Sequence, residues 1–143
     1  MRVQAKCDAS GVSGALYQLL AARLHDIPPA SLGRAARALV ELRLYEDSTA
    51  EAILELAAPA VSTMSAAELS GLVYAHGWCR LDMPANVLAA CDARAAQLLR
   101  ERAVGPHEVS ELVQGFDKLR LCLHETVRSC MRLCASMTVA ALP

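Results

Sequence analysis

The residues of this sequence that could do chemistry are its four histidines and six cysteines. His76 and Cys79 stand three residues apart on one predicted helix, where each could offer a ligand to a metal ion. Two ligands without a second pair are a weak metal signal, and a histidine packed beside a buried cysteine is the simpler interpretation. The cysteines contain no CxxC pair and no zinc-ribbon spacing. We therefore expect no metal site and no cofactor.

A second thiol group lies near the end of the sequence. Cys130 and Cys134 are one helical turn apart, and Cys122 lies two turns before Cys130. Such a stripe could act as a redox sensor, but it is also typical of a packed helix, which we favour. The sequence has no glycine-rich phosphate loop, nucleophile elbow or HExxH motif. It therefore predicts neither an enzyme nor a small-molecule substrate.

Arginine gives a stronger indication, since twelve of the fourteen basic residues are arginines. Arg43, Arg80 and Arg120 recur at the same place in three related segments, so a regular stack of these segments would align them along one edge. Such a row could follow a phosphate backbone. Alternatively, each arginine caps the C-terminus of its own helix, where the helix dipole favours a cation. Further candidates for RNA contact are Arg34, Arg37, Arg128 and Arg132.

The overall charge limits what these arginines can do alone. Fifteen acidic residues leave a formal net charge of −1, so the chain has little net attraction for free RNA in solution. Tyr74 and Trp78 could stack on a base, as aromatic residues do in single-strand recognition. No apolar run reaches the roughly 18 to 20 residues that a membrane span requires, and we expect no membrane contact.

The elements that would position these side chains form an internal repeat. Three segments align without gaps, at residues 31–44, 68–81 and 108–121, and their starts are 37 and 40 residues apart. Apolar residues recur at helical spacing, and each segment closes with Arg-Leu. The third and eighth positions are small, which would let a neighbouring helix approach closely. At the ninth position His76 stands where the other segments have Leu39 and Phe116.

Each of these helices is followed by a second one. We expect the second helices at about 48–61, 84–102 and 124–137, and an additional helix at about 12–24. The patterns Ser48-x-x-Glu51 and Ser65-x-x-Glu68 are capping boxes that mark helix starts, and Pro84 is expected in the first turn of its helix.

These helix pairs predict one domain of repeated units. The low content of β-branched residues argues against a sheet, so the fold class is all-α. We expect an α-solenoid of about seven helices with three full repeats of 37–40 residues. A single domain over 1–143 would comprise a leading half-repeat at 12–27 and repeats at 28–64, 65–104 and 105–138.

The repeat resembles the octotricopeptide and heptatricopeptide families over about residues 28–137. Their first helix has the form L-A-x-x-L-W-A-L-A-x-L, which segments 68–81 and 108–121 match best. The resemblance implies a role on organellar RNA, in its stabilisation, processing or translation, or as a subunit of a divergent mitochondrial ribosome. Armadillo and HEAT repeats also fit the repeat length.

The last segment of the sequence is apolar and should be covered by another chain. Its candidate interface residues are Leu133, Met137, Val139 and Leu142. We therefore expect a non-catalytic subunit of an organellar ribonucleoprotein, chiefly a mitochondrial ribosome in the matrix, that bridges ribosomal RNA and neighbouring proteins. The alternatives are an armadillo- or HEAT-like adaptor without RNA contact and an organellar transcript-binding factor; chloroplast and cytoplasm remain alternative locations.

Overall fold

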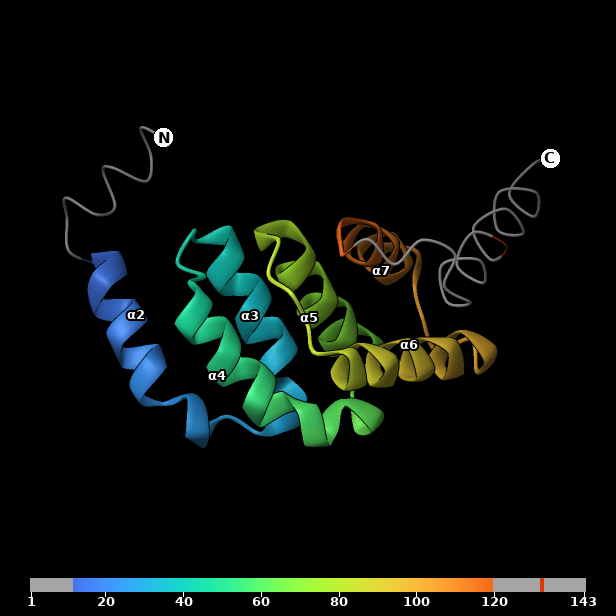
Figure 1. Cartoon of the computed structure of the whole chain (residues 1–143), viewed down its shortest axis with the longest axis horizontal. Helices are drawn as coiled ribbons and strands as arrows, with labels where there is room; N and C mark the ends of the chain where they lie inside the picture. Colours follow the sequence, from blue (N-terminus) through green and yellow to red (C-terminus); the bar gives the residue numbers. More distant parts are fainter. Residues whose placement is uncertain (1–11, 120–131, 133–143) are drawn as a thin grey trace.

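The computed structural model describes residues 12–119 and residue 132, and over this part every regular element is a helix (Figure 1). The prediction of an all-α protein is thus confirmed for the described residues. The α-helices are α2 (Val12–Ala22), α3 (Leu32–Glu41), α4 (Asp47–Ala57), α5 (Ala66–Cys79), α6 (Ala85–Arg100) and α7 (Pro106–Lys118). Three short 3-10 helices join them: η1 (Leu24–Asp26), η2 (Pro29–Ser31) and η3 (Ala58–Thr63).

Each of the first six predicted helices coincides with one of these α-helices, and the seventh, at 124–137, lies outside the described residues. The predicted helix 48–61 divides into α4 and η3. Pro59 lies at the start of η3, where its missing N–H cannot continue the α-helical hydrogen-bond ladder.

The helix starts follow the predicted signals only in part. Ser65 is the N-cap of α5, and its hydroxyl accepts the backbone N–H of Glu68 at 3.4 Å, which confirms this cap. The capping box at Ser48 is wrong, because α4 already begins at Asp47 and places Ser48 inside the helix. An acidic residue in the first turn is favourable with the helix dipole there. Pro84 is the residue before α6 rather than part of its first turn.

The three first helices of the aligned segments, α3, α5 and α7, pack side by side with α5 in the middle (Figure 1). Of the second helices, α4 packs against α3, and α6 packs against α5 and η3. The central position of α5 explains its burial: from Leu69 to Gly77 only Tyr74 is not buried. One main apolar cluster joins α3, α5 and α7 to the second helices, with Leu32, Leu72 and Phe116 fully enclosed.

Glycines allow this layer to pack backbone against backbone. A Cβ added at Gly71 would lie 2.6 Å from the carbonyl oxygen of Gly33, and one at Gly77 would lie 2.6 Å from that of Gly115. A Cβ at Gly33 would collide with the backbone of Glu68. The close approach expected from small residues is therefore confirmed at Gly33 and Gly115, the third and eighth positions of their segments.

Candidate nucleic-acid interface

The recurring Arg-Leu pair ends a helix through its backbone. Arg43 and Arg80 adopt the left-handed conformation, with φ of 58° and 54°. The next residue then donates its N–H back to the helix: Leu44 to the carbonyl of Leu39 at 2.8 Å, and Leu81 to that of His76 at 3.0 Å. These are the bonds of a Schellman motif, in which the leucine also packs back on the helix. The recurrence of Arg-Leu therefore has a structural explanation that involves no ligand.

Arg102 forms a third such motif at the end of α6. Its φ is 54°, and Ala103 donates its N–H to the carbonyl of Leu98 at 2.9 Å. Glycine usually occupies this left-handed position, because it has no Cβ to clash with the neighbouring carbonyl. The left-handed backbone could not be predicted from the residue type, since arginine is unusual at this position.

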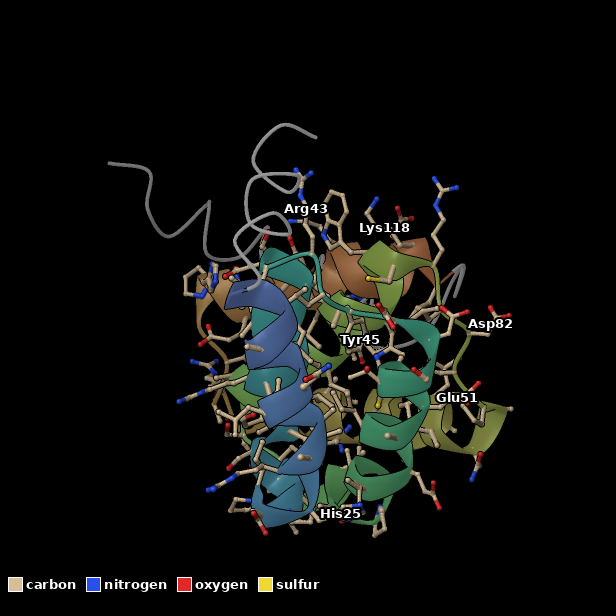
Figure 2. All side chains as sticks on the ribbon, turned by 90° about the vertical axis from the view of Figure 1, so that its left-hand side faces the viewer. His25, Arg43, Tyr45, Glu51, Asp82 and Lys118 are labelled. Atoms are coloured by element: carbon tan, nitrogen blue, oxygen red, sulfur yellow. The ribbon has the colours of Figure 1, made fainter. Side chains whose placement is uncertain are left out.

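The side chains of Arg43 and Arg80 are exposed at the edge where α3, α5 and α7 end. The ammonium of Lys118, in the last turn of α7, lies 4.2 Å from the centre of the Trp78 ring. Figure 2 shows Arg43 and Lys118 at the same edge. Trp78 is 47% exposed, and its ring lies 5.8 Å from that of Tyr74. We call Arg43, Trp78, Arg80 and Lys118 the basic–aromatic edge.

Carboxylates also lie beside this edge. A hollow of about 390 Å³ is lined by Arg80, Asp82, Asp117, Lys118 and Leu119. Among its described lining residues two are cations and two are anions, so their formal charges cancel. The predicted RNA contacts at Arg120 and Arg128 lie outside the described residues, as do the four residues of the predicted partner interface, Leu133, Met137, Val139 and Leu142. Arg132 is described as helical and exposed.

Arg34 forms an ion pair with a buried carboxylate. Arg34 of α3 pairs with Glu68 of α5, with 2.9 Å between Nε and Oε1. The other oxygen of Glu68 accepts the backbone N–H of Arg34 at 2.8 Å. Glu68 is only 7% exposed, so it caps the first turn of the neighbouring helix from within the interface.

Arg37 has more interaction partners than Arg34. It pairs with Glu41 at 3.1 Å and with the buried Glu111 of α7, and its guanidinium lies 5.3 Å from the centre of the Tyr74 ring. His107 lies 2.8 Å from Glu111 in the same group. The side chain thus links α3 to α7 across α5. Arg34 and Arg37 are thus held in ion pairs with carboxylates of neighbouring helices, and their predicted contact with RNA stays a prediction. The sequence analysis did not predict that Glu68 and Glu111 are buried and paired with arginines. The capping box at Ser65-x-x-Glu68 was the one signal that pointed to Glu68.

His76 occupies a core position rather than a ligand site. It is fully buried, like Phe116 at the equivalent position of α7. Its Nδ1 lies 3.0 Å from the carbonyl of Leu72, and its Nε2 lies 3.3 Å from the hydroxyl of Tyr45. A carbonyl oxygen only accepts, so the contact with Leu72 requires the proton on Nδ1, whereas the hydroxyl of Tyr45 can donate or accept. Burial lowers the pKa of His76 and raises that of Tyr45.

The described cysteines have the environment of packing residues. Burial raises the pKa of Cys91 to about 12 and, together with the charge of Asp47, raises the pKa of the partly buried Cys79. Raised thiol pKa values disfavour the thiolate that metal binding and redox chemistry need. Within residues 12–119 no three His, Cys, Asp or Glu side chains are grouped so that they could hold a metal ion. The thiol stripe at Cys130 and Cys134 lies outside the described residues.

None of the helices in the described part is long and apolar enough to cross a membrane. Comparisons with protein-family models, with curated proteins and with solved structures gave no match for this chain. Any account of its function therefore depends on the sequence pattern and on the geometry above.

Proposed function

We propose that this protein is a non-catalytic α-solenoid subunit of an organellar ribonucleoprotein, a mitochondrial ribosome in the first instance, that contacts ribosomal RNA along its basic–aromatic edge. The observation that carries the proposal is the exposed Trp78, in contact with Lys118, at the edge where α3, α5 and α7 end and where Arg43 and Arg80 are also exposed. Aromatic rings that stack on bases and cations that follow the phosphates are the common means of binding single-stranded nucleic acid.

The burial pattern supports the repeated architecture within this proposal. On the central helix α5 both small positions, Ser70 and Ala75, are fully buried. On α3 the third position, Gly33, is buried and the eighth, Ala38, is exposed, whereas α7 has the reverse arrangement at Gly115 and Ser110. The third position thus faces the following first helix and the eighth faces the preceding one. A first helix at the end of a stack has a neighbour on one side only, so one of its two small positions should be exposed, as on α3 and α7.

The cap geometry makes a clean test possible. Replacing Arg43 and Arg80 by glycine removes both charges and suits the left-handed backbone, so the double variant should fold at least as well as the parent. If the edge contacts RNA, the variant should lose its co-sedimentation with a large RNase-sensitive particle in a sucrose gradient. Arg102→Gly is the matched control, since it makes the same change at the end of α6, outside the α3–α5–α7 layer.

The outcomes separate the alternatives. Sequencing the RNA of the particle fraction distinguishes ribosomal RNA from transcripts, and transcripts would favour the transcript-binding factor. Migration of the tagged parent near its own mass, unchanged by RNase, contradicts the ribonucleoprotein proposal. A loss of RNA in Arg102→Gly as large as that in Arg43→Gly or Arg80→Gly alone would show general charge attraction rather than contact at the edge.

A specific observation also favours the second candidate, a protein–protein adaptor without RNA contact. A hollow of about 380 Å³ lies between α2 and the ends of α3, lined mainly by leucines and Ile27. Leu19 and Leu42 line it and are 56% and 57% exposed. Exposed large apolar side chains that line one hollow are typical of protein contact. Under this candidate, the arginine-to-glycine variant keeps all partners, whereas Leu19→Asp with Leu42→Asp loses them.

A further inference from the structure

A groove of opposite character runs along α4. Asp47, Glu51 and Glu55 follow one another at intervals of four residues, which places them in one stripe along this helix. Asp82, in the turn that leads to α6, lies across from them, and Figure 2 shows Glu51 and Asp82 on the same side of the molecule. We call these four carboxylates and the surface between them the acidic groove.

The groove has volume and an apolar floor. Two adjoining hollows of about 310 and 510 Å³ share Glu51, Leu54 and Asp82 as lining residues. Most of the lining between the carboxylates is apolar or small: Ala50, Leu54, Ala58, Leu81, Met83, Pro84 and Val87. The other described lining residues are His76, Arg80 and Asn86. The carboxylates therefore border a surface that an apolar side chain could cover, which distinguishes the groove from a simply solvated acidic face.

Arg80 is the one cation among the described lining residues of the groove, so its four carboxylates leave it with a formal charge of −3. The other acidic residues at the helix contacts, Glu68 and Glu111, pair with arginines, whereas none of the four groove carboxylates forms a salt bridge with a described residue. Like charges four residues apart on a helix destabilise it slightly. The stripe thus leaves α4 with a repulsion that a cationic partner would relieve.

We propose that the acidic groove binds an amphipathic helix of a partner protein, with Arg or Lys side chains along the groove carboxylates and small or medium apolar side chains on the floor. The stripe from Asp47 to Glu55 spans eight residues, or about 12 Å of helix, so a partner helix with cations at intervals of four residues matches its spacing. Docking of an amphipathic helix in an apolar groove is a known mode of recognition. Arg80 borders both the groove and the basic–aromatic edge, but the excess of carboxylates in the groove repels RNA, so the partner helix is a ligand separate from the proposed RNA.

The test uses the full-length protein and a fluorescein-labelled synthetic helix of about 18 residues, with leucines on one face and lysines at intervals of four beside them. We expect saturable binding that weakens with salt, and no binding of a twin peptide with glutamates in place of the lysines. The variant Glu51→Lys/Glu55→Lys should bind about tenfold more weakly, since two charge pairs become repulsions. The matched control is Glu101→Lys/Glu108→Lys, which changes the net charge equally at sites that line neither the groove nor the leucine-lined hollow of α2 and α3.

Amide chemical-shift mapping locates the peptide directly. Shifts confined to α4 and residues 81–87 support the proposal. Equal weakening in the two double variants, or shifts centred on the leucine-lined hollow of α2 and α3, would overturn it. If the Glu51→Lys/Glu55→Lys change alone moves resonances of residues 120–143, the chain's own C-terminal segment occupies the groove, and a partner helix is excluded. Thermal unfolding of each variant confirms that all compared proteins are folded.

Discussion

The replacement of Gly77 by alanine probes the packing that holds the three first helices together. In an exposed helix this change is stabilising by about 1 kcal/mol, because alanine is the better helix former. At Gly77, however, the new Cβ would lie 2.6 Å from the carbonyl oxygen and 2.8 Å from the Cα of Gly115. Both atoms belong to the backbone of α7, so relief requires a shift of the whole helix rather than a side-chain rotation.

The expected magnitude follows from these opposing effects. Overpacking of a core costs about 1–3 kcal/mol, and the backbone contact puts Gly77→Ala near 3. After the gain in helix propensity, the net loss is about 2 kcal/mol, which lowers Tm by roughly 8 °C for a domain of this size. Urea unfolding followed by circular dichroism measures the loss directly.

Gly14→Ala provides the matched control for this experiment. Nothing lies within 4 Å of a Cβ at Gly14, so the same substitution in α2 should raise stability by about 0.5 kcal/mol. Gly115→Ala should behave like Gly77→Ala, because its Cβ would lie 2.8 Å from the backbone of Val73. A Gly77→Ala protein as stable as the parent would refute the close contact of α5 with α7.

Three further predictions concern polar groups. Burial lowers the pKa of His76, so below about pH 6.5 the unfolded chain takes up a proton that the folded chain does not. The free energy of unfolding should therefore fall by up to about 1.4 kcal/mol per pH unit. In urea titrations His76→Leu should flatten this profile between about pH 7 and 5.5. Glu68→Ala should cost about 2 kcal/mol by leaving the N–H of Arg34 without its acceptor, and Glu68→Gln less than half of that, as chemical denaturation can measure. Arg80→Gly should raise the free energy of unfolding by about 1 kcal/mol, since glycine relieves the left-handed strain; an unchanged or lower value contradicts the assignment of the cap.

The sequence predicted the helices well because apolar residues recur at regular helical spacing, as α3 and α7 illustrate. It predicted helix ends less well. The division after Ala57 depends on Pro59, and the start of α4 at Asp47 displaced a capping box that spacing alone favoured. Both are local effects of one residue, which an average over a helical period does not detect.

Only the parts of the candidate interface that depend on residue spacing within a repeat could be predicted from the sequence. The recurrence of Arg43 and Arg80 at one edge follows from the repeat, but the ion pairs of Arg34 and Arg37 depend on how closely α3, α5 and α7 approach one another. That distance is set by glycines, of which Gly71 and Gly77 lie outside the small positions that the alignment identified. Side chains that pair across 34 or 74 positions of the chain produce no periodic pattern in the sequence.

The left-handed arginines link the structural and functional interpretations of the repeat. Glycine would close these helices with less strain, and this chain uses glycine freely where helices touch, yet Arg43, Arg80 and Arg102 all carry a positive φ. If the favourable position of a cation at a helix C-terminus maintains them, all three should respond alike to replacement, with equal changes in stability and no partner lost. If the basic–aromatic edge contacts RNA, replacing Arg43 or Arg80 should weaken RNA binding and replacing Arg102 should not. All three replacements should change the free energy of unfolding by the same amount. The comparison therefore distinguishes a charge kept for its own helix from a charge kept for a ligand.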